Sequence, residues 1–268
     1  MSFVIDFTGR TVLITGAGGL PGKGMGRSLA TGFAALRAQV VAVDMNRDSV
    51  EEIVATINQC GGRAVAVTAD LGEENEIERV VAAAESAFGP VDVLVNHAGF
   101  GVFENTTETT PERWHHILAV NLTAPFLLSR RVLPAMMERG QGVIVNTISV
   151  CGVVGGRSGA AYTAAKHGLV GLTKNIAVSH AGYGIRCVGV CPGSVRADPG
   201  MADSHPAVSA AVPGPGSWAH DWVPKTKAIN PRIGQPDEVT RMHLFLASDA
   251  ASFVNGAIVT VDGGWTAV

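Results

Sequence analysis

Short apolar runs rich in β-branched residues alternate with longer stretches of helical periodicity along most of this chain. Most of the runs are almost continuously hydrophobic, which is typical of strands in a parallel sheet covered by helices on both faces. The runs predicted as strands are 11–15, 40–44, 64–69, 91–96, 143–149, 186–191 and 257–261. The stretches predicted as helices are 25–37, 47–59, 74–88, 111–139, 160–181 and 236–248.

This alternation predicts an α/β fold. We expect a single-domain, Rossmann-like, doubly wound and mostly parallel seven-stranded sheet with helices on both faces, formed by residues 1–268. Right-handed crossovers then place a ligand at the carboxyl ends of the strands. One irregular stretch, 194–231, is rich in Pro, Gly, Ala and Ser and contains Trp218 and Trp222. A loop of this length is usually functional, so we predict a substrate lid there.

The composition narrows the class of partner. Charged residues make up only 16% of the chain, the net charge is −3, and no basic run is present, so nucleic acid and anionic lipid are not the expected partners. No apolar run is long enough for a spanning helix, and the first ten residues lack a signal-peptide pattern. The four cysteines form no CxxC pair and no metal-ligand spacing. We therefore expect a cytoplasmic protein without a metal site that acts on a small molecule.

A glycine-rich segment follows the first predicted strand. It runs from Gly16 to Gly26 and precedes the first predicted helix. Glycines here permit a tight turn and let backbone N–H groups approach a pyrophosphate at the helix N-terminus. Such a segment alone is weak evidence, but its position between strand and helix is the one that dinucleotide binding requires.

Asp44 ends the second predicted strand, about 20 residues beyond the glycines. A carboxylate at this place accepts hydrogen bonds from an adenosine ribose and repels a 2′-phosphate, so it favours NAD over NADP. Lys23, inside the glycine segment, points the other way because a basic residue there can meet a 2′-phosphate. We expect NAD and keep NADP as the less favoured cofactor.

Polar residues also end the third and fourth predicted strands. Asp70-Leu71 ends the third, and Asn96-His97-Ala98-Gly99 ends the fourth. In a doubly wound sheet both segments lie along one crevice, near the adenine and the middle of a cofactor. Asn and Asp also favour strand ends for turn formation, so neither segment is specific by itself.

Tyr162 and Lys166 lie four residues apart on a predicted helix and therefore share a face. An ammonium near a phenol favours the phenolate, so we expect the pKa of Tyr162 to be lowered from its ordinary value near ~10. Oxidation of an alcohol needs such a base, and reduction of a carbonyl needs the same group as an acid. Ser149, at the end of the fifth predicted strand, can hydrogen-bond the substrate oxygen. The spacing alone also occurs on ordinary solvated helices.

These motifs together resemble the short-chain dehydrogenase/reductase family, and the resemblance covers essentially the whole chain. The residues that carry it are Thr15-Gly16-Ala17, Gly24-Met25-Gly26, Asp70-Leu71, Asn96-His97-Ala98-Gly99, Asn121, Ser149, Tyr162-x-x-x-Lys166, Pro192-Gly193, Asn230 to Gly234, Phe245 to Ser248 and Val261-Asp262-Gly263-Gly264. No single motif is specific, whereas the ordered set is.

The resemblance implies a role for each matching residue. Tyr162 is expected to be the acid/base and Ser149 to orient the substrate oxygen. Lys166 is expected to bind the nicotinamide ribose, and Asn121 to hold a proton-relay water beside it. The implied cofactor contacts are Gly16, Gly24, Met25, Gly26, Asp44, Asp70, Leu71, Asn96, Ala98, Gly99, Tyr162, Lys166, Pro192, Gly193 and Val195. The resemblance also implies a homotetramer built from the helices that contain Asn121 and Tyr162 and from the C-terminal strand.

The sequence departs from the family pattern in three places. Six residues separate Ala17 from Gly24 where the family usually has two, so Gly22 is an alternative to Gly24 and Gly26 in the glycine register; we prefer the latter pair. His97 replaces a more usual Asn, which we interpret as a local packing change. Ala197 stands where a Thr often binds the carboxamide.

We expect an NAD(H)-dependent oxidoreductase that acts on a secondary alcohol or its ketone. Two alternatives remain. One is an NADPH-dependent carbonyl reductase of the oxoacyl type, against which Asp44 weighs. The other is a non-catalytic nucleotide-binding module with the same fold, motivated by the enlarged glycine loop and Ala197. Loss of Ser149, Tyr162 or Lys166 would favour the module, and all three are present.

Overall fold

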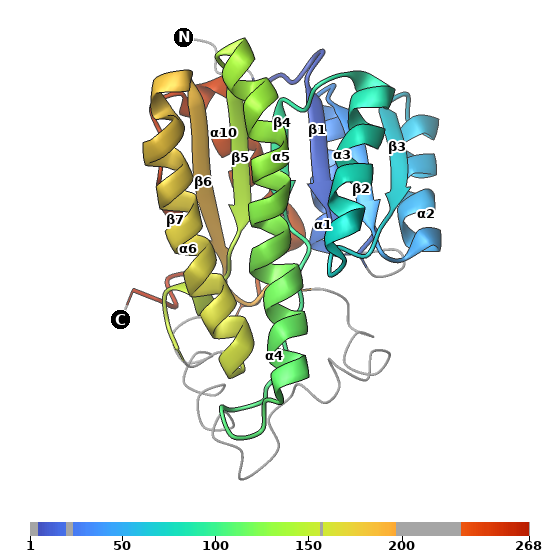
Figure 1. The fold of residues 1–268 in the computed structure, drawn as a ribbon. Coiled ribbons are helices and arrows are strands. Elements are labelled where there is room, and N and C mark those ends of the chain that lie inside the picture. The colour runs from blue at the N-terminus through green and yellow to red at the C-terminus, as the bar shows by residue number, and fades with distance from the viewer. Residues whose placement is uncertain (1–4, 20–23, 156–157, 197–231, 268) are drawn as a thin grey trace.

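A seven-stranded sheet forms the centre of the molecule (Figure 1). The structure is a computed structural model that describes residues 5–19, 24–155, 158–196 and 232–267. All neighbouring strands are parallel, in the order β3-β2-β1-β4-β5-β6-β7. The strands are β1 (Thr11–Thr15), β2 (Gln39–Asp44), β3 (Arg63–Thr68), β4 (Val93–Asn96), β5 (Gly142–Thr147), β6 (Ile185–Pro192) and β7 (Ile258–Val261). The predicted doubly wound α/β fold is confirmed, with a sheet that is wholly parallel among these strands.

Helices cover both faces of the sheet in two layers (Figure 1). The helices are α1 (Met25–Ala35), α2 (Arg47–Gln59), α3 (Glu74–Phe88), α4 (Pro111–Leu118), α5 (Ala124–Arg139), α6 (Ala160–His180) and α10 (Pro236–Ala247). Side chains of α1, α2 and α10 pack in one core, and those of α3, α5 and α6 pack in the other.

The double cover explains why the strands are apolar throughout. In β1, Val12 and Ile14 belong to the core under α1, while Leu13 belongs to the core on the opposite face. Successive side chains of a strand point to opposite faces, so a strand buried on both sides needs an apolar residue at every position. Burying one such side chain contributes roughly 1.5–3 kcal/mol.

Two elements differ from the sequence-based expectation. The strand predicted over 143–149 ends at Thr147, and Ser149 instead caps a short 3₁₀ helix, Val150–Gly152, by accepting a hydrogen bond from the Cys151 N–H at 3.2 Å. The helix predicted over 111–139 is interrupted by a π-helical turn, Ala119–Thr123, between α4 and α5. Periodicity of apolar residues does not reveal either change, because both affect the backbone for only a few residues.

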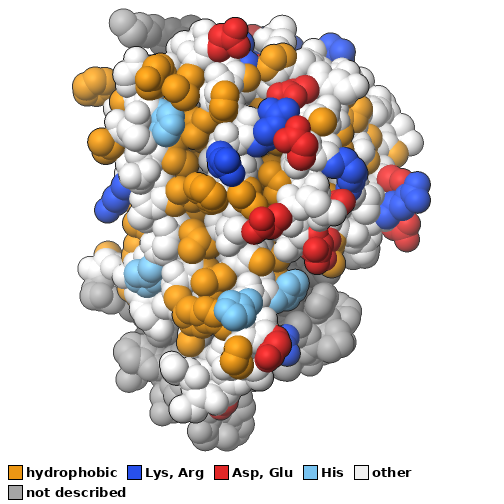
Figure 2. Space-filling view, in the orientation of Figure 1, with side chains coloured by type: hydrophobic (Ala, Val, Ile, Leu, Met, Phe, Trp, Pro, Cys, Tyr) orange, Lys and Arg blue, Asp and Glu red, His pale blue; other side chains and the backbone are white. Residues whose placement is uncertain are grey.

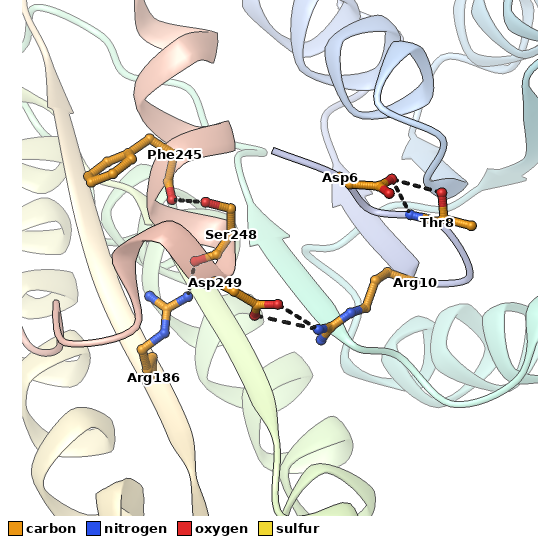
Figure 3. A network of polar contacts seen from close by, with 7 residues as sticks. All are labelled: Asp6, Thr8, Arg10, Arg186, Phe245, Ser248 and Asp249. Atoms are coloured by element: carbon orange, nitrogen blue, oxygen red, sulfur yellow. Dashed lines mark hydrogen bonds and ion pairs between the residues drawn. The ribbon is translucent and has the colours of Figure 1, made fainter. Parts of the chain in front are cut away.

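A network of polar contacts holds the amino-terminal edge of the sheet together (Figure 3). Arg186, near the start of β6, donates to the backbone oxygens of Leu246 and Ser248 at 2.7 and 2.9 Å. Arg10, just before β1, pairs with Asp249 at 3.3 Å. These contacts attach the end of α10 to the sheet at the amino-terminal ends of the strands, opposite to the carboxyl ends.

The strand order reverses between β1 and β4. The chain proceeds outward from β1 through β2 to β3, and then returns to place β4 on the other side of β1. In such sheets a crevice opens at the carboxyl ends of the two strands that flank the reversal. No helix within the described ranges is long and apolar enough to cross a membrane.

Candidate active site

The residues predicted for the site lie at or just beyond the carboxyl ends of the strands. Gly16 follows β1, Asp44 ends β2, Asn96 ends β4 and Ser149 follows β5. The others are Gly24, Met25 and Gly26 at the start of α1, Asp70 and Leu71 after β3, Ala98 and Gly99 after β4, Asn121 in the π-helical turn, Tyr162 and Lys166 on α6, and Pro192, Gly193 and Val195 at and after the end of β6. All predicted site residues within the described ranges therefore lie on the side of the sheet where the strands have their carboxyl ends.

The turn between β1 and α1 depends on two glycines in close contact. A β-carbon on Gly26 would lie 1.8 Å from the backbone oxygen of Gly16, which no side chain permits. Gly16 itself has φ +68°, and a β-carbon there would lie 2.9 Å from the Cα of Ala98. The start of α1, the end of β1 and the loop after β4 thus approach one another as closely as backbones can. Residues 20–23, including Lys23 and Gly22, lie outside the described ranges.

Asp44 is bound to this turn by its carboxylate. One oxygen accepts from the N–H groups of Gly18 and Gly19 at 3.0 and 3.2 Å, and the other accepts from the Asn46 N–H at 3.0 Å. The side chain therefore joins the end of β2 to the glycine segment. Its negative charge lies at the turn, where the sequence analysis expects the ribose.

Thr15 is a site residue for which the sequence analysis predicts no role. Its hydroxyl accepts hydrogen bonds from the backbone N–H groups of His97 and Ala98 at 2.9 and 3.0 Å. These contacts fix the loop after β4 against the end of β1. The signal was present in the sequence, since a Thr that ends the first strand can reach the neighbouring strand end in this topology.

Asn121 lies in the π-helical turn, a feature often found at functional sites. Its side-chain N–H₂ donates to the backbone oxygens of Ile117 and Phe100, both at 2.9 Å. Its side-chain oxygen is buried and has no hydrogen-bond partner among the described residues. That oxygen lies 2.4 Å, and the Lys166 Nζ 3.3 Å, from a β-carbon built on Gly99. Glycine at position 99 therefore leaves room beside an unsatisfied acceptor and an ammonium.

Lys166 is almost completely buried, with 3% of its surface exposed. Its Nζ donates to the backbone oxygen of Thr147 at 3.0 Å and lies 5.5 Å from the centre of the Tyr162 ring. Burial, which penalises the charged form, lowers the pKa of Lys166 to about 8. The ammonium is thus close to its titration range at physiological pH.

Tyr162 departs from the expected electrostatics. Burial raises the pKa of this phenol, and the nearby thiols of Cys151 and Cys191 add to the rise, while a hydrogen bond with Ser149 lowers it. The expectation that Lys166 lowers this pKa is therefore wrong for the structure without ligand, because removal of water from the phenolate has the larger effect. Gly101, which the sequence analysis missed, lies against the ring: its β-carbon would be 2.7 Å from the Tyr162 Cγ.

The remaining predicted residues form hydrogen bonds beside the carboxyl ends of the strands. The N–H₂ group of the buried Asn96 side chain donates to the Asn146 side-chain oxygen on the neighbouring strand at 2.8 Å. This side chain therefore forms a contact inside the protein. Asp70 accepts from the Gly72 N–H at 2.8 Å. Gly193 donates its N–H to the backbone oxygen of Val261 at 3.1 Å, which places it directly beside β7.

The predicted lid begins and ends in paired backbone. Val195 forms a parallel bridge with Gly234, and the Arg196 N–H donates to the Gly234 oxygen at 2.8 Å. Residues 197–231, with Ala197 and both lid tryptophans, lie outside the described ranges. The lid itself remains a prediction.

The groups at the carboxyl ends of the strands suit a dinucleotide. The glycine turn lies at the start of α1 and the Asp44 carboxylate is bound to it, while the Asn121 oxygen and the Lys166 ammonium lie close together beside Gly99. Within the described part of the chain, no group of His, Cys, Asp and Glu side chains is arranged to hold a metal ion. Together with the Ser149–Tyr162 hydrogen bond, these groups can bind a cofactor and move one proton.

Comparisons with known proteins agree with this chemistry. Residues 18–266 match a family model described as enoyl-(acyl carrier protein) reductase. A 3beta-hydroxysteroid dehydrogenase of Eggerthella lenta is 34% identical over 263 residues, covering 97% of this chain and 95% of its own length. A cyclohexanol dehydrogenase of an Acinetobacter species is 36% identical over 261 residues, covering 97% and 96%. A solved structure from Beutenbergia cavernae, with NADP bound at low occupancy, is similar at a TM-score of 0.83 and 37% identity, covering 98% of this chain and 99% of that one.

Proposed function

Because this chain belongs to the short-chain dehydrogenase/reductase family, we propose that it interconverts a secondary alcohol and its ketone with NAD(H), using Tyr162 as the acid/base. Its relatives are dehydrogenases and reductases that act on CH–OH groups, so the chain is an oxidoreductase of this kind. The observation that carries the detailed proposal is the group formed by the buried Lys166 and the half-buried Ser149 and Tyr162 at the carboxyl ends of the strands.

Each residue of this group has one task in the proposed reaction. When bound, the nicotinamide cofactor supplies or accepts the hydride. In the direction of reduction, the Tyr162 phenol donates its proton to the carbonyl oxygen, which the Ser149 hydroxyl holds in place. In the direction of oxidation, Tyr162 must first release this proton to solvent, and the phenolate, which the Lys166 ammonium stabilises, then accepts the hydroxyl proton of the alcohol. The raised pKa of Tyr162 keeps the phenol protonated before ligands bind.

NAD is the proposed cofactor because of Asp44. Its carboxylate is held at the glycine turn by Gly18 and Gly19, where a 2′-phosphate would meet a negative charge. The family binds nicotinamide cofactors, and the related structure from Beutenbergia cavernae has NADP bound, so the measurement must use both cofactors. Gly16, Gly24, Met25 and Gly26 are proposed to contact the pyrophosphate.

The proposed substrate is a small secondary alcohol or the corresponding ketone. Two relatives, a 3beta-hydroxysteroid dehydrogenase and a cyclohexanol dehydrogenase, are named for alcohols carried on rings. Cyclic alcohols and ketones are therefore the first members of a substrate panel, followed by sugars, diols and hydroxyacyl compounds. A cytoplasmic location is part of the proposal, because no disulfide joins the four cysteines, all of which lie in the described ranges.

Replacement of Tyr162 tests the proposal directly. Tyr162→Phe removes the proton donor and keeps the ring, so we expect turnover to fall by about 10²–10⁴-fold with cofactor binding retained. The chain has one other tyrosine, Tyr183, which is exposed, and Tyr183→Phe is the matched control. The measurement is nicotinamide absorbance over the substrate panel with NAD(H) and NADP(H). Near-normal turnover of Tyr162→Phe would contradict the acid/base role.

The same panel decides the two alternatives. Turnover only with NADPH and oxoacyl substrates would favour the carbonyl reductase of the oxoacyl type. Cofactor binding by the wild type without turnover of any substrate would favour the non-catalytic module.

We also propose a homotetramer. Hydrophobic side chains gather on the face over α5 and α6 (Figure 2), and exposed apolar residues in these elements and in α4 include Trp114, Phe126 and Val178. Contiguous exposed apolar surface of this kind is typical of subunit interfaces.

A further inference from the structure

Two histidines and a threonine form a hydrogen-bonded chain that the proposed reaction does not use. The His97 Nδ1 lies 3.3 Å from the Thr147 hydroxyl, and the same hydroxyl lies 2.9 Å from the His243 Nε2. His97 follows β4, Thr147 ends β5 and His243 lies on α10, so the chain joins three separate elements. His243 is fully buried, and Thr147 is only 4% exposed.

The direction of these hydrogen bonds follows from the ends of the chain. The His243 Nδ1 lies 3.0 Å from the backbone oxygen of Val239, which can only accept, so Nδ1 carries the hydrogen. Burial lowers the pKa of His243 to about 4 and that of His97 to about 3, so both rings are neutral. The His243 Nε2 must then accept from the Thr147 hydroxyl, and this hydroxyl must accept from the His97 Nδ1–H. Only one arrangement of hydrogens satisfies every contact.

Thr147 is the point at which this chain meets the site. Its backbone oxygen is the acceptor for the Lys166 Nζ, at 3.0 Å. Its side chain is held from two directions, by His97 and by His243. Thr147 is restrained by its backbone pairing in the sheet and by the hydrogen bonds of its side chain, so its peptide group keeps a fixed orientation. The backbone oxygen of this peptide group accepts the hydrogen bond from the Lys166 ammonium.

We propose that the His97–Thr147–His243 chain is a positioning device for Lys166, which keeps the Thr147 oxygen where it retains the ammonium at the cofactor edge. The inference rests on the proposed function, in which the Lys166 ammonium binds the nicotinamide ribose. His97, which the sequence analysis interprets as a packing change, thereby gains a role together with His243, which that analysis does not single out.

The surroundings of Lys166 determine what loss of this support does. The titratable groups that face it are Tyr162 on its own helix, Cys151 after β5, Cys191 on β6 and His97 after β4. Burial already lowers the pKa of Lys166 to about 8. The Thr147 oxygen hydrogen-bonds the charged form, so displacement of this oxygen removes a stabilising contact and lowers the pKa further.

A pair of substitutions at Thr147 tests the role without a substrate. Binding of NADH and of NADPH is measured by their fluorescence from roughly pH 6 to 10, the range that brackets this titration. We expect wild-type binding to weaken as Lys166 loses its proton. In Thr147→Val, which removes only the hydroxyl function, the midpoint should move to lower pH by about half a unit or more. Thr147→Ser, which restores a hydroxyl, should return the midpoint to the wild-type value.

Two further variants separate positioning from stability. Thr173→Val removes another buried hydroxyl, which accepts a hydrogen bond from Asn146 and donates one to the Leu169 oxygen. This variant should leave the pH midpoint of cofactor binding unchanged. His97→Ala changes a loop residue and should shift the pH midpoint of cofactor binding in the same direction as Thr147→Val. It replaces Thr147→Val in the test if that variant does not fold.

The possible results are distinguishable. A Thr147→Val or His97→Ala protein that binds with the wild-type midpoint, or a wild type whose binding does not depend on pH, overturns the positioning role. A wild type that binds neither NADH nor NADPH overturns the proposed function itself.

Discussion

At the scale of single residues, the pKa values of the site side chains depend more on burial than on the spacing of the residues along the sequence. The four-residue spacing of Tyr162 and Lys166 predicted a shared helix face, and the structure places the ammonium 5.5 Å from the ring centre. The predicted direction of the Tyr162 pKa shift was wrong, since burial raises this pKa and the charges of Cys151 and Cys191, which come from other parts of the chain, add to the rise. Spacing along a helix carries no information about such neighbours.

Asp44 binds the glycine turn and is proposed to select the cofactor, and substitutions can distinguish these two effects. Asp44→Asn keeps an oxygen for the Gly18 and Gly19 N–H groups and removes the charge that repels a 2′-phosphate. We expect the ratio of NADP to NAD affinity to rise by about tenfold, as for loss of a partly screened repulsion of roughly 1–2 kcal/mol. Asp44→Ala should show the same change in ratio and weaker binding of both cofactors.

Fluorescence titration with NADH and NADPH measures this ratio. Asp249→Asn removes the same charge at the opposite edge of the sheet and is the control. If the ratio stays at the wild-type value in both Asp44 variants, this carboxylate does not select the cofactor.

At the scale of elements, the sequence predicted most boundaries to within two residues. Alternation of apolar runs located β1 and α2, for example, at their observed residues. The exceptions are the π-helical turn around Asn121 and the end of β5 before Ser149, two places at which the predicted site residues lie. A local departure from regular structure leaves the average periodicity intact, so only the structure shows it.

Contact between α1 and β1 requires glycine at position 26. Gly26→Ala would place a β-carbon 1.8 Å from the Gly16 oxygen, so α1 must move away from the strand end. We expect a loss of stability of about 1–3 kcal/mol, typical of overpacking, and a large loss of cofactor affinity. Ala35→Ser adds one heavy atom at an exposed position of the same helix and should change neither by much.

Denaturant unfolding and cofactor titration of both variants provide the measurement. A Gly26→Ala protein with wild-type stability and affinity would show that the close approach is not needed.

At the scale of the whole molecule, two neutral imidazoles lie between elements that are far apart in the sequence: His97 in the loop after β4 and His243 on α10. The pKa values of His97 and His243 are lowered to about 3 and about 4, below their ordinary value of 6.5. Their stabilising effect is fully present above pH 6.5 and is lost as pH falls from there toward the folded-state values, because the unfolded chain binds protons first. We expect a loss of about 1 kcal/mol for each imidazole and each pH unit in this range.

Urea unfolding at a series of pH values between 7 and about 4.5 measures this slope. His243→Leu should reduce the slope, whereas replacement of the exposed His167 by Asn should not. An unchanged slope in His243→Leu would contradict burial of a neutral ring at that position.

The assembly can be tested on the apolar face over α5 and α6. Phe126 is 46% exposed on α5, and Phe126→Asp places a charge where the proposed homotetramer buries a ring. We expect this variant to sediment as a smaller species than the wild type, because an unpaired charge in an interface costs several kcal/mol. Phe253, exposed after α10, lies in none of the proposed interface elements, and Phe253→Asp is the control. A wild-type monomer would contradict the proposal.

The order of the strands also determines at which stage of synthesis an unpaired strand of this chain can pair with another chain. β1, β2 and β3 are complete by Thr68 and can pair with one another as soon as they emerge. β1 then has an open, apolar edge until Val93–Asn96 is made and inserts as β4 beside it. An unpaired strand edge is a template for pairing with another chain. Nascent chains that stall between these two points should therefore be the ones most dependent on chaperones.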